Sequence, residues 1–129
     1  MSLPTILAIG SGGFIGAVLR AYLNGLISHK VPHELPFGTL GVNLIGSFTM
    51  GLLIAIFMNS GFFSLHTKSF LSTGVLGALT TYSTFAIESF LLLQGGSILL
   101  ALANISLNVL GTIFMAGSGF YLGKFFFNN

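Results

Sequence analysis

Charged residues are nearly missing from this 129-residue chain, and cysteine is missing altogether. Only 5% of the residues are charged, whereas a typical soluble domain has about 25%. So few charges cannot cover a surface that faces water, which indicates that lipid surrounds most of the chain. The lack of cysteine excludes disulfides, thiolate metal sites and cysteine nucleophiles, and a net charge of +2 is too small to indicate nucleic-acid binding.

Long apolar segments take the place of the charges. Hydrophobic residues make up 53% of the chain, and its mean hydropathy is +0.99. A membrane-spanning helix needs about 20 mostly apolar residues, so the chain has room for four spans joined by short loops. We predict an all-α membrane protein with one integral membrane domain over residues 1–129 and spans at about 3–27, 38–58, 69–93 and 97–125.

The third span contains a polar stretch, GALTTYSTF, at residues 77–85. A glycine, five hydroxyl-bearing residues and two aromatic rings follow one another there. In hydrocarbon such a helix-weakening run is tolerated only where protein or a water-filled cavity surrounds it, and broken helices at membrane depth often mark ion or substrate sites. We therefore predict that the third span is broken near its middle and that this segment contacts a small polar solute.

Two further stripes of polar residues run along the second and fourth spans. Each has members at i, i+4 and i+8, which places them on one helical face. The amides in these stripes are either interhelical hydrogen-bonding groups or donors aimed into a pore. Together with the hydroxyls of the third span, the two stripes favour a continuous polar track. Their members are Thr39, Asn43 and Ser47 on the second span, and Asn104, Asn108 and Thr112 on the fourth.

Aromatic rings lie within this polar region. Tyr82 and Phe85 are three residues apart, among Thr81, Ser83 and Thr84. An aromatic ring has a negative face and a positive edge, so ring edges favour an anion over a cation without the tight binding of a full charge.

Two charged residues lie well inside the spans. Arg20 either extends its head to the interface or attracts anions in a vestibule. Glu88 caps a hydroxyl network, pairs with a cation, or couples transport as the carboxylate of an exporter. No Ser/His/Asp set lies at membrane depth, and Glu88 has no acidic partner there, so we expect no enzymatic activity.

The loops carry almost no orientation signal. Lys68 and Lys124 belong to one side of the membrane, and Lys30 and Arg20 to the other. The positive-inside rule counts these residues near helix ends, and the count is equal. Either a single charge decides the orientation, or the chain inserts both ways and forms an antiparallel dimer. Small-residue pairs at Gly12/Gly16 and Gly119/Gly123 predict close helix packing, and oligomerisation is the natural way to bury the polar faces.

Three motifs together resemble the Fluc/CrcB family of fluoride channels, and the likeness covers all four spans. They are GGFIGAVLR at residues 12–20, GTLGVNLIGSF at 38–48 and GALTTYSTF at 77–85. The resemblance implies a passive channel that exports fluoride from the cytoplasm across the bacterial inner membrane and so relieves fluoride toxicity. It also implies an antiparallel, dual-topology homodimer with two pores.

The resemblance also assigns roles to residues. It implies a structural sodium ion at the dimer centre, held by the backbone carbonyls of Gly77 and Thr80. Tyr82 and Phe85 correspond to the family's paired phenylalanines, and Tyr82 departs from the commoner Phe. The remaining assignments are Asn43 for the pore asparagine, Ser83 and Thr84 for the hydroxyl track, and Arg20 and Glu88 for the family's arginine and glutamate.

Two other functions remain open at this stage. A small four-helix multidrug exporter has a similar size, but such exporters carry their coupling glutamate in the first helix. Here the first span has no acidic residue, and the chain has no tryptophan to stack on a cationic drug. A non-transporting assembly subunit is the third possibility, and it leaves the polar stripes unexplained.

Overall fold

A computed structural model describes residues 1–127, so the last two residues of the predicted domain lie outside the described part. Within it, four helical spans are long and apolar enough to cross a membrane, which confirms the predicted number. The elements are α1 (Leu3–Lys30), α2 (Phe37–Asn59), α3 (Leu65–Lys68), η1 (Ser69–Leu76), α4 (Gly77–Leu79), α5 (Tyr82–Gln94) and α6 (Ile98–Phe127).

The helices extend beyond the predicted spans at several ends. α1 continues three residues beyond the predicted end at residue 27, and the third span begins at Leu65 rather than at residue 69. Hydropathy marks the part of a helix that lies in hydrocarbon, whereas backbone hydrogen bonds continue into the polar flanks. The N–H of Val31, for example, still donates to the carbonyl of Ile27 at 2.8 Å.

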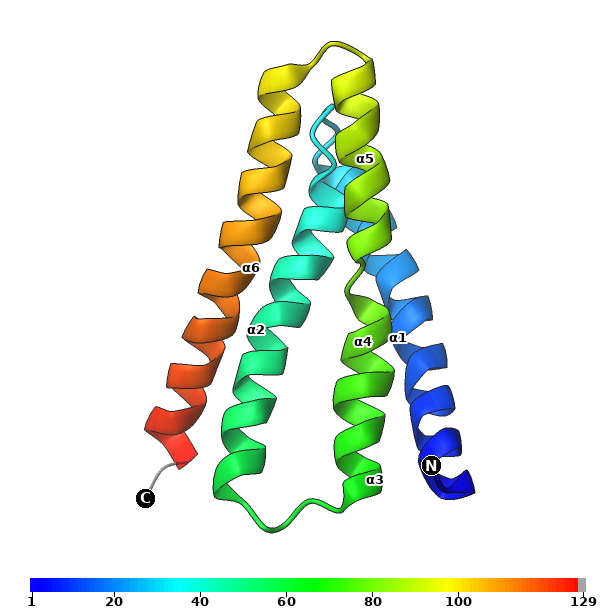
Figure 1. The fold of residues 1–129 in the computed structure, drawn as a ribbon, viewed down its shortest axis with the longest axis vertical. Coiled ribbons are helices and arrows are strands. Elements are labelled where there is room, and N and C mark those ends of the chain that lie inside the picture. The colour runs from blue at the N-terminus through cyan, green and yellow to red at the C-terminus, as the bar shows by residue number, and fades with distance from the viewer. Residues whose placement is uncertain (128–129) are drawn as a thin grey trace.

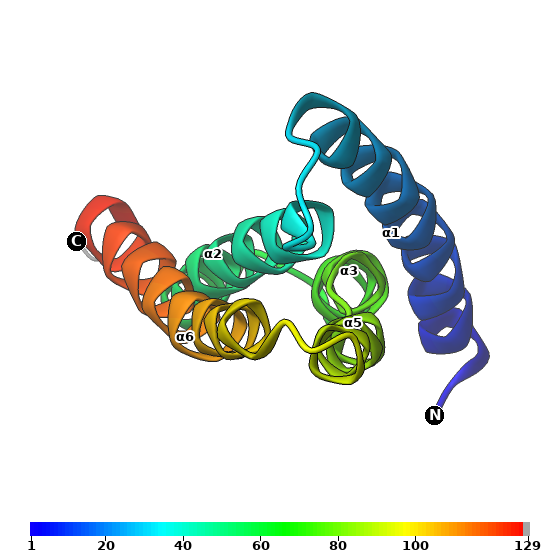
Figure 2. The same cartoon turned by 90° about the horizontal axis from the view of Figure 1, so that it is seen from above.

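The helices form an open bundle whose two ends differ (Figure 1). The N-terminus, the end of α6 and the α2–α3 loop lie at one end, and the α1–α2 and α5–α6 loops lie at the other. Seen from above, α2 packs against α6 while α1 lies on the other side of the third span (Figure 2). The two predicted sides of the membrane are therefore the two ends of this bundle.

Glycines allow the helices to approach closely. A Cβ atom at Gly119 would collide with the backbone of Phe48 on α2, and one at Gly12 would collide with the backbone of η1. Gly12 also lies against the backbone of Gly74, so neither Gly12 nor Gly74 has room for a side chain. The two predicted small-residue pairs thus lie at the α1–η1 and α2–α6 contacts.

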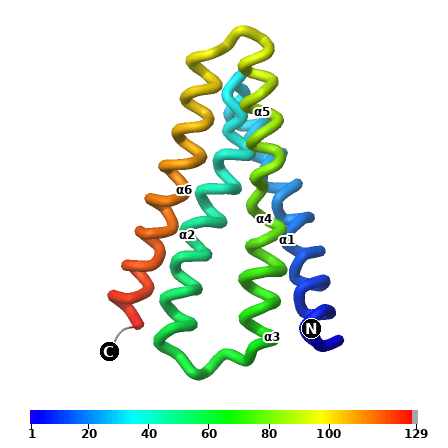
Figure 3. The backbone as a smooth tube through the Cα atoms, in the orientation of Figure 1, coloured from blue at the N-terminus to red at the C-terminus, as the bar shows by residue number. Residues whose placement is uncertain are grey.

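The third span is broken, as predicted. The tube in Figure 3 shows the interruption between α4 and α5. Thr80 (φ −82°, ψ 152°) and Thr81 (φ −145°, ψ 115°) are extended. The side chain of Thr81 then caps α5 by accepting a hydrogen bond from the N–H of Thr84 at 3.3 Å. A wider π-helical segment, η1, precedes the break and was not predicted from the sequence.

Polar side chains fill much of the interior. The buried apolar cluster is small and consists of Val42, Leu76 and Leu79. In contrast, large apolar side chains are exposed along every span, as expected for a surface that faces lipid. The buried polar residues are Thr39, Asn43, Thr81, Ser89, Asn104 and Asn108.

Gly119→Ala should destabilise the protein, because its new methyl group has to displace the backbone of Phe48. Overpacking of this kind costs about 1–3 kcal/mol. The matched control is Gly117→Ala on the same helix, where nothing lies within 4 Å of the new atom. Unfolding in mild detergent by increasing sodium dodecyl sulfate, followed by circular dichroism, measures the difference. Equal stability of the two variants would contradict the close approach of α2 and α6.

Candidate functional site

The break in the third span is held by one side chain from α2. Asn43 is 7% exposed, and its Oδ1 accepts a hydrogen bond from the N–H of Thr81 at 2.8 Å. Its Nδ2 donates to the carbonyl of the same residue at 3.1 Å. The amide thus satisfies both backbone groups of Thr81 where the helix cannot. Asn43 thus connects the predicted polar stripe on α2 to the predicted break in the third span.

A chain of buried amides continues from Asn43. Its Nδ2 also donates to Oδ1 of Asn108 at 3.0 Å. The Nδ2 of Asn108 donates to the carbonyl and the Oδ1 of Asn104, at 2.9 and 3.0 Å. Asn104 donates to Ser89 at 2.9 Å, and Ser89 donates to the carbonyl of Phe85 at 2.8 Å. We call Asn43, Asn108, Asn104 and Ser89 the amide ladder.

This ladder bears on the two alternatives for the amides. The structure shows interhelical and intrahelical hydrogen bonds that engage Nδ2 of Asn43, Asn108 and Asn104. Asn43 and Asn108 each use both N–H groups of Nδ2, so either would have to give up a bond within the chain before donating to an ion. Asn43 and Asn108 therefore shape the site, and their contact with a solute stays a prediction.

A groove of about 360 Å³ opens beside the ladder at the break. Among the described residues, no Lys, Arg, Asp or Glu lines it. The rings of Tyr82 and Phe85 meet edge to face in it, with centroids 5.4 Å apart. Tyr82 is 79% exposed and Phe85 only 6%. The lining residues are Asn43, Ser47, Thr80, Thr81, Tyr82, Phe85, Asn108, Val109, Thr112 and Ile113.

Six predicted pore residues share this groove, but three do not. Asn104 is fully buried and lies behind Asn108 in the ladder. Ser83 is exposed outside the groove. Thr84 bonds to Thr81 at the start of α5, where their hydroxyls lie 2.9 Å apart. Helical periodicity identified the polar faces, but it could not tell which members face a groove and which face another helix.

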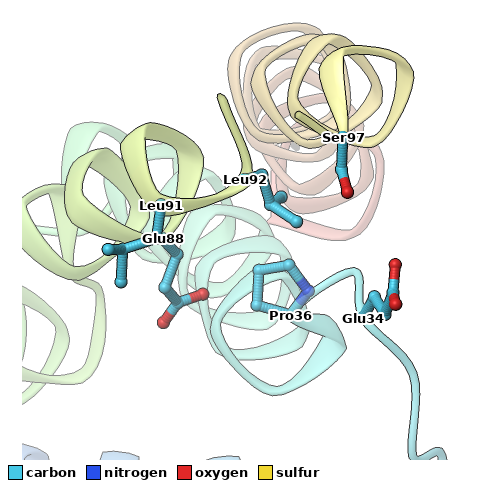
Figure 4. Close-up of a pocket in the computed structure, with 6 residues that line it drawn as sticks. All are labelled: Glu34, Pro36, Glu88, Leu91, Leu92 and Ser97. Atoms are coloured by element: carbon cyan, nitrogen blue, oxygen red, sulfur yellow. The ribbon is translucent and has the colours of Figure 1, made fainter. Parts of the chain in front are cut away.

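A second hollow, of about 370 Å³, lies near the end of the bundle that holds the α5–α6 loop (Figure 4). Both acidic residues of the chain line it, Glu34 from the α1–α2 loop and Glu88 from α5. Thr39 donates to Oε1 of Glu88 at 2.7 Å. This member of the α2 stripe therefore bonds to a residue of the second hollow and does not line the groove. Arg20 lines neither hollow.

The sequence analysis missed several polar partners. Ser89 ends the amide ladder, and its signal is the spacing of four residues from Phe85. On α1, Ser28 donates to Asn24 at 3.1 Å and Asn24 donates to Thr39 at 3.5 Å. The signal for this pair is again a spacing of four residues, near the end of the first span.

Backbone carbonyls are the groups at the break that suit a metal ion. The N–H of Thr81 bonds to Asn43 and that of Thr84 to a side-chain hydroxyl. The carbonyls of Gly77 and Thr80 therefore lose their usual helical partners. Unwound carbonyls of this kind coordinate sodium in other membrane proteins. In residues 1–127 no group of three His, Cys, Asp or Glu side chains is placed to hold a metal.

The chain is similar to known proteins over most of its length. Residues 7–120 match the family model described as CrcB-like protein, Camphor Resistance (CrcB). A protein of Sulfurimonas denitrificans named fluoride-specific ion channel FluC is 79% identical over 124 residues, which cover 96% of each chain. Proteins of the same name are similar in Nautilia profundicola, with 52% identity over 93% of this chain and 94% of the relative, and in Campylobacter jejuni, with 48% identity over 95% and 99%.

Asn43→Ala should destabilise the protein by about 2–4 kcal/mol, because it leaves both Thr81 backbone groups without their partner and each unsatisfied buried group costs about 1–3 kcal/mol. Asn59→Ala is the control, since Asn59 bonds only to a carbonyl of its own helix. Denaturation by sodium dodecyl sulfate in mild detergent, followed by circular dichroism, compares the two. A loss no greater than that of the control would argue against the role of Asn43 at the break.

Proposed function

The chain belongs to the CrcB family, and from this membership and the neutral groove at the helix break we propose that it is a fluoride-selective, passive ion channel. The relatives named as fluoride-specific ion channels cover nearly the whole chain. A channel binds and releases its ion without chemical change, so this function needs no catalytic group.

The observation that carries the proposal is the composition of the groove. Hydroxyl-bearing residues and two aromatic rings line it, and no described charged side chain does. Conduction needs binding that is favourable enough for entry and weak enough for release. Neutral donors and the positive edges of aromatic rings meet that condition for an anion better than buried lysine or arginine would.

Fluoride is small and strongly hydrated, so the pore has to replace its water molecules step by step. The hydroxyls of Ser47 and Tyr82 and the ring edges of Tyr82 and Phe85 are the groove's candidate contacts. A narrow track of such groups disfavours the larger chloride ion by size. The amides of Asn43 and Asn108 stand beside this track, and their bonds to Thr81 and Asn104 hold it in shape.

A second copy of the chain would complete the site. Tyr82, Ser83 and Gly77 are exposed in the middle of the third span, and polar backbone and side chains at that depth require cover. We propose an antiparallel homodimer with one pore for each groove. The equal count of positive charges on the two sides supports this arrangement, because neither insertion is favoured.

The two copies would also share one structural sodium ion. The carbonyls of Gly77 and Thr80, which lack their usual helical partners, fit a hard monovalent cation. A bound cation would neutralise their partial negative charges and hold the two breaks together. The sodium ion would be structural, and fluoride could pass without the sodium ion leaving its site.

Passive flow follows the electrical gradient. We propose that the protein lies in the bacterial inner membrane, where a potential that is negative inside drives an anion outward with about 2.3 kcal/mol per 100 mV for each charge. Fluoride would then leave the cytoplasm without any coupling ion. Glu88, the one acidic residue within a span, lines the other hollow, which favours a channel over a proton-coupled exporter.

Liposomes loaded with potassium fluoride test the function. After valinomycin is added, a fluoride electrode should record rapid efflux from vesicles that contain the protein, and chloride-loaded vesicles should release little. Phe85→Ile should lower fluoride efflux by about tenfold or more, since the loss of the ring edge removes a contact of the ion and a barrier higher by about 1.4 kcal/mol slows a rate tenfold. The control is Phe90→Ile, an exposed ring on the same helix. Absence of efflux from folded wild-type protein would refute the channel.

Single cysteines test the antiparallel arrangement, because the natural chain has none. Gly61→Cys and His29→Cys place one thiol in an exposed position at each end of the bundle. In intact cells, a thiol reagent that cannot cross the membrane should label about half of each variant, as expected when equal charge sets no orientation. Complete labelling of one variant and none of the other would establish a single topology and contradict the antiparallel dimer.

A further inference from the structure

Asn104 has a position unlike that of any other polar residue on α6. Its side chain is 0% exposed, it does not line the groove, and its Nδ2 bonds to Ser89 on α5. We propose that Asn104 is a positioning residue: through Ser89 and Asn108 it fixes the segment that carries Tyr82 and Phe85 against α2 and α6. This inference rests on the proposed function only for its effect on fluoride flux.

The direction of the amide ladder is determined at both of its ends. At the break, the N–H of Thr81 needs an acceptor and its carbonyl needs a donor, so Asn43 has only one orientation. At the other end, the hydroxyl of Ser89 donates its hydrogen bond to the carbonyl of Phe85, so its oxygen has to accept from Asn104. Asn108 between them accepts from Asn43 and donates to Asn104. A flip of any amide would set two donors or two acceptors face to face.

This fixed ladder holds α5 at two points. Asn43 holds Thr81 and Asn104 holds Ser89, and eight residues separate these points, which is about 12 Å of helix at 1.5 Å per residue. Tyr82 and Phe85 lie between them. Because the break at residues 80–81 interrupts the third span, α4 cannot set the rotation of α5 through a continuous helix. The two anchors, together with the bond from Thr39 to Glu88, set that rotation and with it the direction of the rings.

The same contacts argue against Asn104 as a contact of the ion, which the stripe on α6 had predicted. Its side chain is fully buried behind Asn108, so an ion could reach the amide only after its neighbours had moved. Buried networks of this kind are rigid when every member is satisfied and costly when one is removed. Asn104 therefore acts on the groove through its neighbours.

The first test compares two hydroxyl deletions. Ser89→Ala and Ser118→Ala each remove a hydroxyl that donates to the carbonyl four residues earlier at 2.8 Å, but only Ser89 also accepts from Asn104. Ser89→Ala and Asn104→Leu should each lower fluoride efflux per folded protein, by on the order of tenfold, and Ser118→Ala should not. The double variant should be no worse than Asn104→Leu alone, because the two changes break the same link. Additive losses would overturn the proposal.

Asn104→Asp provides a pH readout that packing alone would not give. When the introduced carboxyl group is protonated, it can accept from Asn108 and donate to Ser89, as the amide does. The deprotonated carboxylate accepts only and cannot donate to Ser89, so flux should be closer to the wild-type value at about pH 6 than at about pH 9. Glu88, an acidic residue, lies next to Ser89 in the chain, so wild-type flux is measured over the same range. A pH profile that matches the wild type would overturn the proposal.

Hydrogen exchange separates failure of this inference from failure of the channel. Peptides covering residues 77–89 should lose protection in Asn104→Leu and Ser89→Ala, by on the order of tenfold, and keep it in Ser118→Ala. This result is independent of fluoride. If wild-type protein carried no fluoride but the exchange pattern appeared, the ladder would stand and the channel would fall. Unchanged exchange in Asn104→Leu would refute the positioning role even in a working channel.

Discussion

The need to satisfy backbone groups inside hydrocarbon is the constraint on which the rest of this structure depends. Thr80 and Thr81 leave the helical conformation in the middle of a span, where no lipid can donate or accept a hydrogen bond. The side-chain amide of Asn43 supplies both missing bonds to Thr81. Its own orientation is then fixed, and it fixes that of Asn108 on α6. One break thus dictates polar residues on two other spans and places the groove where they meet.

The acidic side chains lie apart from the groove. The two acidic residues gather in the hollow near the α5–α6 loop, where Thr39 bonds to Glu88. The groove at the break instead offers hydroxyls and aromatic edges. A charged group in the groove would bind an anion tightly or repel it, whereas a charge outside the groove acts on the anion only from a distance. The family resemblance and the neutral groove therefore support the same proposed function through different observations.

Much of this arrangement could be predicted from the sequence. Apolar length predicted four spans, and the run from Gly77 to Phe85 predicted the break. The stripes on α2 and α6 were recognised because polar residues four apart share a helical face. Periodicity does not say what that face meets, so it could not distinguish Asn108, beside the groove, from Asn104, which bonds to Ser89. The π-helical winding of η1 was also missed, since it depends on how α1 packs against the third span.

That winding constrains how the chain can change in length. A π-helix has more residues in each turn than an α-helix, and η1 contains the Gly12–Gly74 contact and ends at Leu76, before α4 and the break. Removing one residue of α4, between this contact and the break, would turn everything after it by about 100° relative to α1, since an α-helix has 3.6 residues per turn. The break would then face away from Asn43. The number of residues between Gly74 and the break at Thr80 is therefore as much a part of the site as its side chains.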